Sequence, residues 1–406
     1  IKKIKSQIIL MDKKLKIIIY GLIAFSIICL ICSLAAIFIV RDENARCKNR
    51  AEKCLSCYDE KDYPVINQNP IPNLGKYFNK NYRSQYYYGL RDFFYAASYK
   101  SYLPCGYTKD VVSYNAIKNV LLVGARVIHL DIFYDGIDPF GDDAKIIVGN
   151  VIDGKLSCSR CKNIKKDEHY LEFMNCLEII RDIAWTKTST PLLLYLNMEF
   201  LPNEKLEYQI FSQLKAVLSK RFMHPVFSFQ NKNIGEIPVN QAMGKIIILT
   251  NRKPLDGPLN EITNGVMSDD SSNIILYKLT KNEIEFGGIK TKFAKKEDVL
   301  KICMENMVAV MKDSVPNDKN EYNPKIDTDN YDVSSHFELG ISITFMSFQN
   351  NPKEYLQKFE NGGMILKPAE LIYIPKPKPP VLKRDTRFDY ETTNVSGMNG
   401  FYNFDF

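Results

Sequence analysis

The chain has 406 residues, with 54 Lys or Arg against 47 Asp or Glu and a formal net charge of +7. This composition excludes a disordered, collagen-like or disulfide-dense miniature protein. Residues 1–16 carry six lysines and one aspartate, a charge of +5, which leaves only +2 (+7 less +5) for the rest of the chain. A nucleic-acid-binding domain needs its basic excess on a folded face, so nucleic acid is not an expected partner.

An apolar run over 17–40 contains no charged residue and no proline. As a helix rising about 1.5 Å per residue it would extend about 36 Å, against about 30 Å for the hydrocarbon core of a bilayer. A cleaved signal peptide is the alternative, but the run is longer than a typical signal core and lacks a small-residue cleavage pattern. We expect a basic amino-terminal segment, 1–16, on the cytoplasmic side, followed by a single transmembrane helix, 17–40. Basic residues also follow the run, so the side on which the remaining chain lies stays open.

Eight of the ten cysteines lie beyond the apolar run. In an oxidising compartment they would pair as disulfides, with a connectivity that spacing alone does not determine. A zinc site is the alternative, because two Cys-x-x-Cys pairs supply four thiolates, those of Cys54, Cys57, Cys158 and Cys161. The long separation of the two pairs favours disulfides over zinc, and unpaired structural thiols are a third option.

Residues 41–85 have the polar composition of a stalk, and helices and strands are expected to alternate from residue 86 onward. The predicted helices cover 111–122, 170–185, 204–222 and 295–312. The predicted strands cover 125–133, 145–148, 192–196, 245–250, 273–279, 340–348 and 364–367. This alternation predicts a parallel sheet covered by helices, and its length is that of one α/β barrel of the TIM (β/α)8 type, with its site at the carboxyl ends of the strands.

The expected barrel consists of two halves, 86–250 and 273–375, joined by a surface loop over 251–272 that is rich in Asn, Asp, Gly and Pro. The final segment, 376–406, begins with a polyproline-like stretch and continues without periodicity in a Tyr-, Phe- and Asn-rich sequence. It is predicted to be an arm that packs on a protein partner or is loosely held.

Three motifs follow one another along this part of the chain: SYKSYL at Ser98–Leu103, GARVIHLD at Gly124–Asp131 and FENGGMILKP at Phe359–Pro368. In this order they resemble the X and Y regions of phosphoinositide-specific phospholipase C, a family of the phospholipase C-like phosphodiesterase superfamily. The resemblance extends over about 86–368. It implies a distorted TIM barrel whose first half is X-like and whose second half is Y-like.

Members of that family cleave a phosphodiester with two histidines. The resemblance places Tyr99 at the first histidine position and Val148 at the second. A phenol is a poor proton carrier near neutral pH, and an alkyl side chain carries no proton at all. Because each positioned acid or base contributes about 10²- to 10⁴-fold to the rate, the catalytic positions of the family are degenerate here.

The calcium ligands that the resemblance implies are changed as well. Lys100 stands at the family's asparagine, His129 at its first glutamate and Asn197 at its third-strand glutamate, whereas Asp131 is kept. Calcium takes about six to eight oxygen ligands, whereas these positions offer only the oxygens of Asp131 and Asn197 beside a positively charged lysine, so calcium is not expected to bind. Lys100, Asn197 and Arg252, which lies near the family's inositol-phosphate lysines, are candidate binding residues.

Three functions follow as hypotheses. The first is a membrane-anchored, catalytically inactive barrel with a structural or binding role and no cofactor. The composition is rich in Lys, Asn and Ile, as is typical of AT-rich genomes, so such a protein could be a viral membrane component. The alternative is an active phosphodiesterase on membrane phosphoinositides that uses a cluster of His129, Asp131 and Glu199, with calcium as its cofactor. The third is a protein that binds anionic lipid head groups in the same pocket without cleaving them.

Overall fold

A computed structural model of the chain describes residues 24–33, 88–104, 112–136, 144–152, 155–156, 170–268, 274–279, 296–312, 330, 332–350, 352–359 and 362–374. The expected stalk over 41–85 and the expected arm over 376–406 lie outside these residues, as do both Cys-x-x-Cys pairs.

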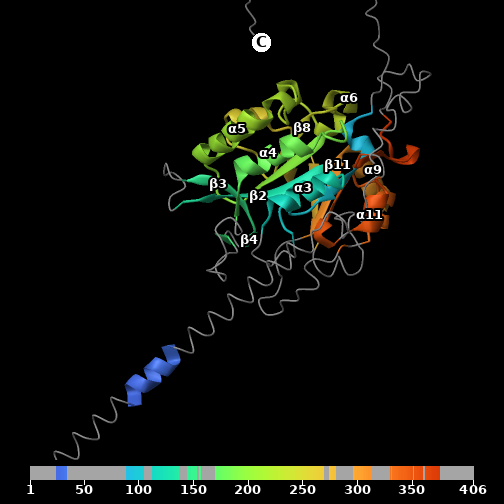
Figure 1. The fold of residues 1–406 in the computed structure, drawn as a ribbon. Helices are drawn as coiled ribbons and strands as arrows, with labels where there is room; N and C mark the ends of the chain where they lie inside the picture. Colours follow the sequence, from blue (N-terminus) through green and yellow to red (C-terminus); the bar gives the residue numbers. More distant parts are fainter. Residues whose placement is uncertain are drawn as a thin grey trace, which may run out of the picture. The chain divides into compact units, whose positions relative to one another are not determined.

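Eight parallel strands form a closed barrel (Figure 1). Each strand pairs with the next along the chain, and the last pairs with the first through Tyr95 and Ile343, so the barrel has no open edge. The strands are β1 (Phe93–Ser98), β2 (Val127–Asp135), β7 (Leu192–Met198), β8 (Ile246–Thr250), β9 (Gly265–Ser268), β10 (Ile274–Leu279), β11 (Met307–Lys312) and β12 (Ile343–Met346). The predicted TIM-type α/β barrel is therefore confirmed.

Most residues of the barrel strands are buried on both faces, which explains the largely apolar sequences of these strands. Every residue of β1, β8 and β11 is buried, including the IIILT run of β8. One face of such a strand points into the barrel and the other contacts the surrounding helices, so both faces are mainly apolar away from the carboxyl ends of the strands.

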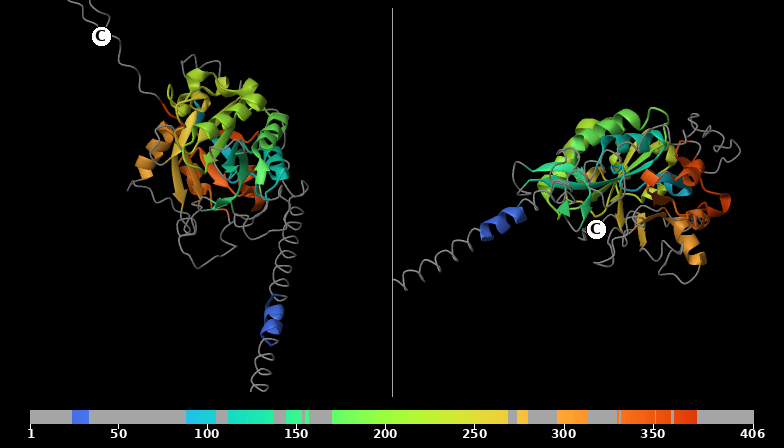
Figure 2. Two further views of the ribbon diagram at one scale, coloured as in Figure 1. Left: turned by 90° about the vertical axis from the view of Figure 1, so that its left-hand side faces the viewer. Right: turned by 60° about the horizontal axis from the view of Figure 1, so that its bottom comes forward.

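Helices surround the barrel (Figures 1 and 2), and α3 (Tyr114–Leu122), α4 (Phe173–Ile183) and α5 (Glu204–Leu218) lie side by side. Side-chain caps fix two of their starts. Ser113 accepts a hydrogen bond from the Asn115 backbone at α3, and Asn203 accepts one from Leu206 at α5. The other α-helices described within 88–374 are α6 (Val239–Ala242), α7 (Pro258–Ile262), α9 (Lys296–Glu305), α10 (Ser334–Glu338) and α11 (Lys353–Gln357).

Three short additional strands, β3, β6 and β13, extend the barrel sheet, and two more form a separate pair. The strand β3 (Lys145–Gly149) pairs antiparallel with β2 and with β6 (Tyr170–Glu172), while β4 (Val151–Ile152) and β5 (Lys155–Leu156) pair with each other. At the other side β13 (Met364–Leu366) runs antiparallel to β1. The turn before β13 needs glycine, because Gly363 has a φ of +74° and a Cβ there would overlap the Gly124 carbonyl oxygen.

Two predicted segments are wrong. The expected helix over 295–312 ends at Glu305, and Met307–Lys312 is the barrel strand β11. The expected loop over 251–272 contains α7 and β9, so the two half-barrels are joined by barrel elements of their own. The strand β1 lies in a stretch for which no strand was predicted.

The apolar run over 17–40 is described only at 24–33, which is helical and exposes its large apolar side chains, among them Phe25 and Leu30. Within the described residues, no helix is both long and apolar enough to cross a bilayer. The rest of the predicted transmembrane helix lies outside the described part of the chain.

The expectation that all eight cysteines beyond the apolar run pair as disulfides is wrong for two of them. Cys176 of α4 and Cys303 of α9 are buried and unpaired. Burial raises the thiol pKa of Cys303 to about 11 and that of Cys176 still further, so both behave as small apolar side chains of the core.

Candidate functional site

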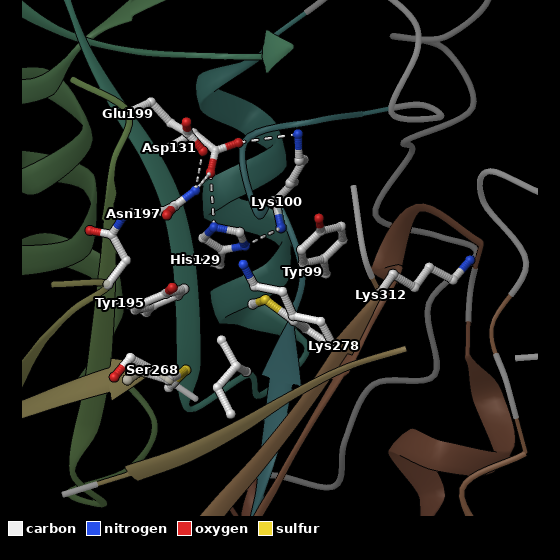
Figure 3. A pocket seen from close by; sticks show the side chains of 14 residues that line it. Tyr99, Lys100, His129, Asp131, Tyr195, Asn197, Glu199, Ser268, Lys278 and Lys312 are labelled. Atoms are coloured by element: carbon white, nitrogen blue, oxygen red, sulfur yellow. Dashed lines mark hydrogen bonds and ion pairs between the residues drawn. The ribbon is translucent and has the colours of Figure 1, made fainter. Parts of the chain in front are cut away.

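A cavity of about 410 Å³ opens at the carboxyl ends of the barrel strands (Figure 3). This is the end at which TIM barrels carry their functional residues. Its lining comes from the ends of β1, β2 and β7 through β11, and consists of Tyr99, Lys100, His129, Asp131, Tyr195, Asn197, Glu199, Asn251, Met267, Ser268, Leu276, Lys278, Met311 and Lys312. The predicted residues Tyr99, Lys100, His129, Asp131, Asn197 and Glu199 therefore meet in one cavity.

The register of β2 and β7 brings the acidic residues together. Asp131 of β2 is paired with Asn197 of β7 in the parallel ladder. Because side chains alternate along an extended chain, His129 and Asp131 share the inner face of β2. Asn197 lies on the inner face of β7, and Glu199, directly after that strand, points to the same side. The Asn197 amide nitrogen donates hydrogen bonds to Asp131 Oδ1, at 2.7 Å, and to Glu199 Oε1, at 2.6 Å.

Asp131 is the centre of the cluster. Its Oδ2 accepts a hydrogen bond of 2.6 Å from the Tyr102 hydroxyl and lies 3.2 Å from Lys100 Nζ. Its Oδ1 accepts the Asn197 bond and lies 2.9 Å from His129 Nε2. Burial alone would raise the pKa of Asp131, but Lys100 and His129 outweigh it and hold the pKa well below its usual range. The carboxylate stays ionised, and both of its oxygens are engaged.

Both ring nitrogens of His129 face protein atoms. Its Nδ1 accepts a hydrogen bond of 3.3 Å from the Lys100 backbone N–H, so the network assigns the ring proton to Nε2. Nε2 faces Asp131 Oδ1 at 2.9 Å, although outside the alignment of a hydrogen bond. The ring is buried between those of Tyr99 and Tyr195, each with its centroid 5.0 Å away. This histidine offers no lone pair to a ligand in the cavity.

Glu199 differs from Asp131 because it is half-buried and lies at the edge of the cluster. Burial, and next the charge of Asp131, raise the pKa of Glu199. Of the two cavity carboxyl groups, Glu199 is therefore the one that takes up a proton more readily. It is the better candidate for proton transfer.

The cavity also contains lysines that sequence reasoning missed. Lys278 of β10 points toward His129 and Lys100, whereas Lys312 of β11 points away from them (Figure 3). The available signal was their position at the ends of the apolar strands IILYKL and MVAVMK. Lys312 was missed because its segment was assigned to a helix. Tyr102 and Asn150, which bind Asp131 and Lys100, were missed because neither follows a barrel strand directly.

Two predicted site residues lie elsewhere. Arg252 does not line the cavity; its Nη1 binds Glu207 Oε1 of α5 at 2.6 Å. Val148 is fully buried in β3, where it pairs with Ile132 and Leu171. Among the predicted residues, the cavity therefore receives its positive charge from Lys100.

Calcium does not fit the residues at this site. The Lys100 ammonium contacts Asp131 Oδ2 and also donates a hydrogen bond of 2.8 Å to Asn150 Oδ1. A calcium ion needs about six to eight oxygen ligands, and two of the nearest oxygens are engaged by a cation already. Among the described residues no group of three or more His, Cys, Asp or Glu side chains is arranged to hold a metal ion.

Comparison with known proteins agrees with this geometry. Residues 87–252 match the family model of the phosphatidylinositol-specific phospholipase C X domain. The chain has a phosphatidylinositol-specific phospholipase C-like fold. A search of curated protein sequences returns no match.

Several solved structures are similar to this phospholipase C-like chain. PLC21 of L. pealei is 14% identical with a TM-score of 0.49, and the alignment covers 70% of this chain and 38% of the PLC21 chain. A calcium-dependent phosphoinositol-specific phospholipase C from Pseudomonas sp. is 10% identical with a TM-score of 0.40, and the alignment covers 68% of this chain and 95% of the Pseudomonas chain. Phosphatidylinositol-specific phospholipase C from Listeria monocytogenes has 14% identity and a TM-score of 0.40, covering 66% and 93%. The chain thus spans little more than a third of the length of the L. pealei protein.

Proposed function

We propose that this chain is a membrane-anchored phospholipase C-like barrel that binds an anionic head group and does not cleave it. The observation that carries the proposal is that the acidic cluster at the base of the open cavity is engaged by the protein's own side chains. Asp131 is engaged by Tyr102, Lys100 and Asn197, and both nitrogens of His129 face protein partners. A carboxylate and an imidazole held in this way are structural groups.

Proton transfer to a substrate lacks its family carriers. Tyr99 lines the cavity, but its ring packs against His129 and Phe345, and a phenol holds its proton near neutral pH. Val148 lies outside the cavity lining altogether. With two such positions lost, each of which contributes about 10²- to 10⁴-fold, the barrel is a pseudoenzyme.

The remaining charges favour an anionic ligand. Lys100, Lys278 and Lys312 line the cavity against the two carboxyl groups of Asp131 and Glu199, and Lys100 is already paired with Asp131. Beyond this pair, the Lys278 ammonium points into the cavity, and the carboxyl group of Glu199 has a raised pKa. A phosphorylated head group, such as an inositol phosphate, supplies the matching negative charge and hydroxyl groups.

Membrane attachment rests on the apolar run over 17–40. The described helix over 24–33 exposes Phe25, Ile28 and Leu30 by 58% to 66% of their surface, and apolar side chains at this density need lipid or protein to cover them. We assign the amino terminus to the cytoplasm and the segment 376–406 to contacts with protein partners. The Lys-, Asn- and Ile-rich composition is compatible with a viral membrane component.

One observation favours the alternative function, an active phosphodiesterase on phosphoinositides. The raised pKa of Glu199 and its place at the cavity edge suit a general base, with His129 and Asp131 beside it. In that case the reaction would have to proceed without the calcium that the family uses, because the site does not fit it.

Hydrolysis and binding assays separate the two functions. The full chain, purified in detergent and reconstituted into vesicles containing phosphatidylinositol, should release no inositol phosphate with calcium or with EDTA. The same preparation should bind myo-inositol 1-phosphate in calorimetry. Turnover that disappears in both Asp131→Asn and Glu199→Gln would replace the pseudoenzyme with the phosphodiesterase, and failure to bind inositol phosphate would leave only a structural role.

A further inference from the structure

Lys100 places a positive charge inside the acidic cluster. Its Nζ lies 3.2 Å from Asp131 Oδ2 and 2.8 Å from Asn150 Oδ1, and the side chains of the ion pair expose only 5% and 1% of their surface. An ammonium between a carboxylate oxygen and an amide oxygen stands where a hard metal ion would be bound by the same two atoms. The ammonium carries one charge and needs no further ligands to balance this carboxylate.

The backbone at Lys100 is specialised for this placement. Among the described residues Lys100 is the single non-glycine residue with a positive φ, +43°. Three hydrogen bonds hold the loop against β2: Lys100 N–H to His129 Nδ1 at 3.3 Å, Ser101 N–H to the His129 carbonyl at 3.0 Å, and His129 N–H to Ser101 Oγ at 3.0 Å. A left-handed backbone at a long side chain persists only where its surroundings determine it in this way.

We propose that Lys100 is a built-in cation that takes the place of a metal ion, so that the cluster is complete without calcium and excludes it. A calcium ion bound by Asp131 would lie beside the buried ammonium and be repelled by it, and it would have to take over the oxygens of Asp131 and Asn150 that Lys100 already engages. The proposal concerns the occupancy of the site and goes beyond the proposed function, since it holds whether or not a substrate is cleaved.

Lys100→Asn is the informative substitution. Asparagine tolerates a positive φ better than lysine does, so the loop can keep its conformation. The change removes the ammonium and leaves the Asp131 carboxylate buried without its cation, next to the oxygens of Asn150 and Glu199. A divalent cation can then bind where Lys100 Nζ was.

The experiment compares the full-length wild type, Lys100→Asn and the double variant Lys100→Asn/Asp131→Asn in detergent. The Tm is followed by circular dichroism in EDTA and in rising millimolar CaCl2, and bound calcium is counted by equilibrium dialysis with radioactive calcium. Wild type should bind no calcium and keep its Tm. Lys100→Asn should melt below wild type in EDTA and gain several degrees, saturably, with calcium, whereas the double variant should not respond.

Two results would overturn the proposal. One is calcium binding by wild type that the single variant Asp131→Asn, dialysed alongside it, abolishes. The other is a folded Lys100→Asn protein that does not respond to calcium. If Lys100→Asn does not fold, the wild-type dialysis alone decides, with absence of bound calcium as the supporting result. Because these readouts are Tm and bound calcium, they are independent of the hydrolysis and inositol-phosphate assays that test the proposed function.

Discussion

His336 provides the clearest test of the barrel's energetics, because it is a buried base whose pKa is strongly shifted. It lies in α10 with 2% of its surface exposed, and its Nδ1 is 3.3 Å from Thr344 Oγ1 of β12. Burial lowers the pKa of His336 to about 4 from an ordinary 6.5, although the charge of Asp332 opposes the shift. The folded protein therefore holds a neutral ring under conditions in which the unfolded chain takes up a proton.

The sign and size of the effect follow from linkage. Between pH 6.5 and about pH 4 the unfolded state binds one more proton at this site than the folded state does, so stability falls as the pH falls through this window. A difference of about 2.5 pKa units corresponds to about 3 kcal/mol at the acid end. Above pH 6.5 both states are neutral at this residue, and it makes no pH-dependent contribution.

The assay is urea unfolding of the full chain at several pH values from 7 to 4.5, followed through the fluorescence of Trp185, the one tryptophan of the chain. His336→Asn is the matched variant, because its amide can keep the bond to Thr344 and does not titrate. Its free energy of unfolding should fall less steeply with acid than that of wild type, by about 1 kcal/mol at pH 5.5 and more below. Parallel pH profiles for the two proteins would refute the assigned burial cost.

Three further predictions concern other parts of the barrel. Burial lowers the pKa of Lys367 to about 8, so Lys367→Met should raise the free energy of unfolding at pH 7 by about 1 to 2 kcal/mol, a figure that allows for the loss of one hydrogen bond. This gain should shrink between pH 8 and 10.5, where the folded wild type has lost the proton that its unfolded chain still holds; a variant less stable than wild type at pH 7 would contradict the reasoning. Gly363→Ala should lower the free energy of unfolding by about 2 kcal/mol or more in the same titration, because φ is positive there and the new Cβ would overlap the Gly124 carbonyl. The control Gly257→Ala, at a site with open space for a Cβ, should lower it much less, and equal losses would argue against the overlap. Lys278→Ala should weaken binding of myo-inositol 1-phosphate about three- to tenfold in calorimetry, while the exposed control Lys215→Ala should not change it.

The strands that could be predicted are those whose apolar runs have clear ends. Leu192–Met198 begins after Pro191, and Ile246–Thr250 is preceded by a glycine and a lysine. The missed strand Met307–Lys312 follows α9 with Asn306 alone between them, so one apolar pattern covers both elements. Gly265–Ser268 is only four residues long and lies in a polar stretch, and it becomes a strand through its pairing with β8 and β10. Tertiary pairing decides such short segments, and local sequence does not.

The candidate site was predictable where it depends on strand geometry. The spacing of His129 and Asp131 on one strand, and of Asn197 and Glu199 on another, placed each pair on one face, and the parallel register joined the pairs. The partners contributed by loops were not predictable. The bond from Lys100 N–H to the His129 ring depends on a left-handed backbone that lysine rarely adopts, and no sequence pattern indicates it.

The cluster also explains how a barrel with the proposed loss of its reaction can keep its cavity. An unpaired Asp131 would be costly inside the barrel, because burying a carboxylate without partners is strongly unfavourable. Lys100, Tyr102 and Asn197 supply the charge and hydrogen bonds that make its burial tolerable. The same contacts that satisfy the carboxylate hold the ends of β1, β2 and β7 in position, so the cavity keeps its shape and Lys278 remains directed into it.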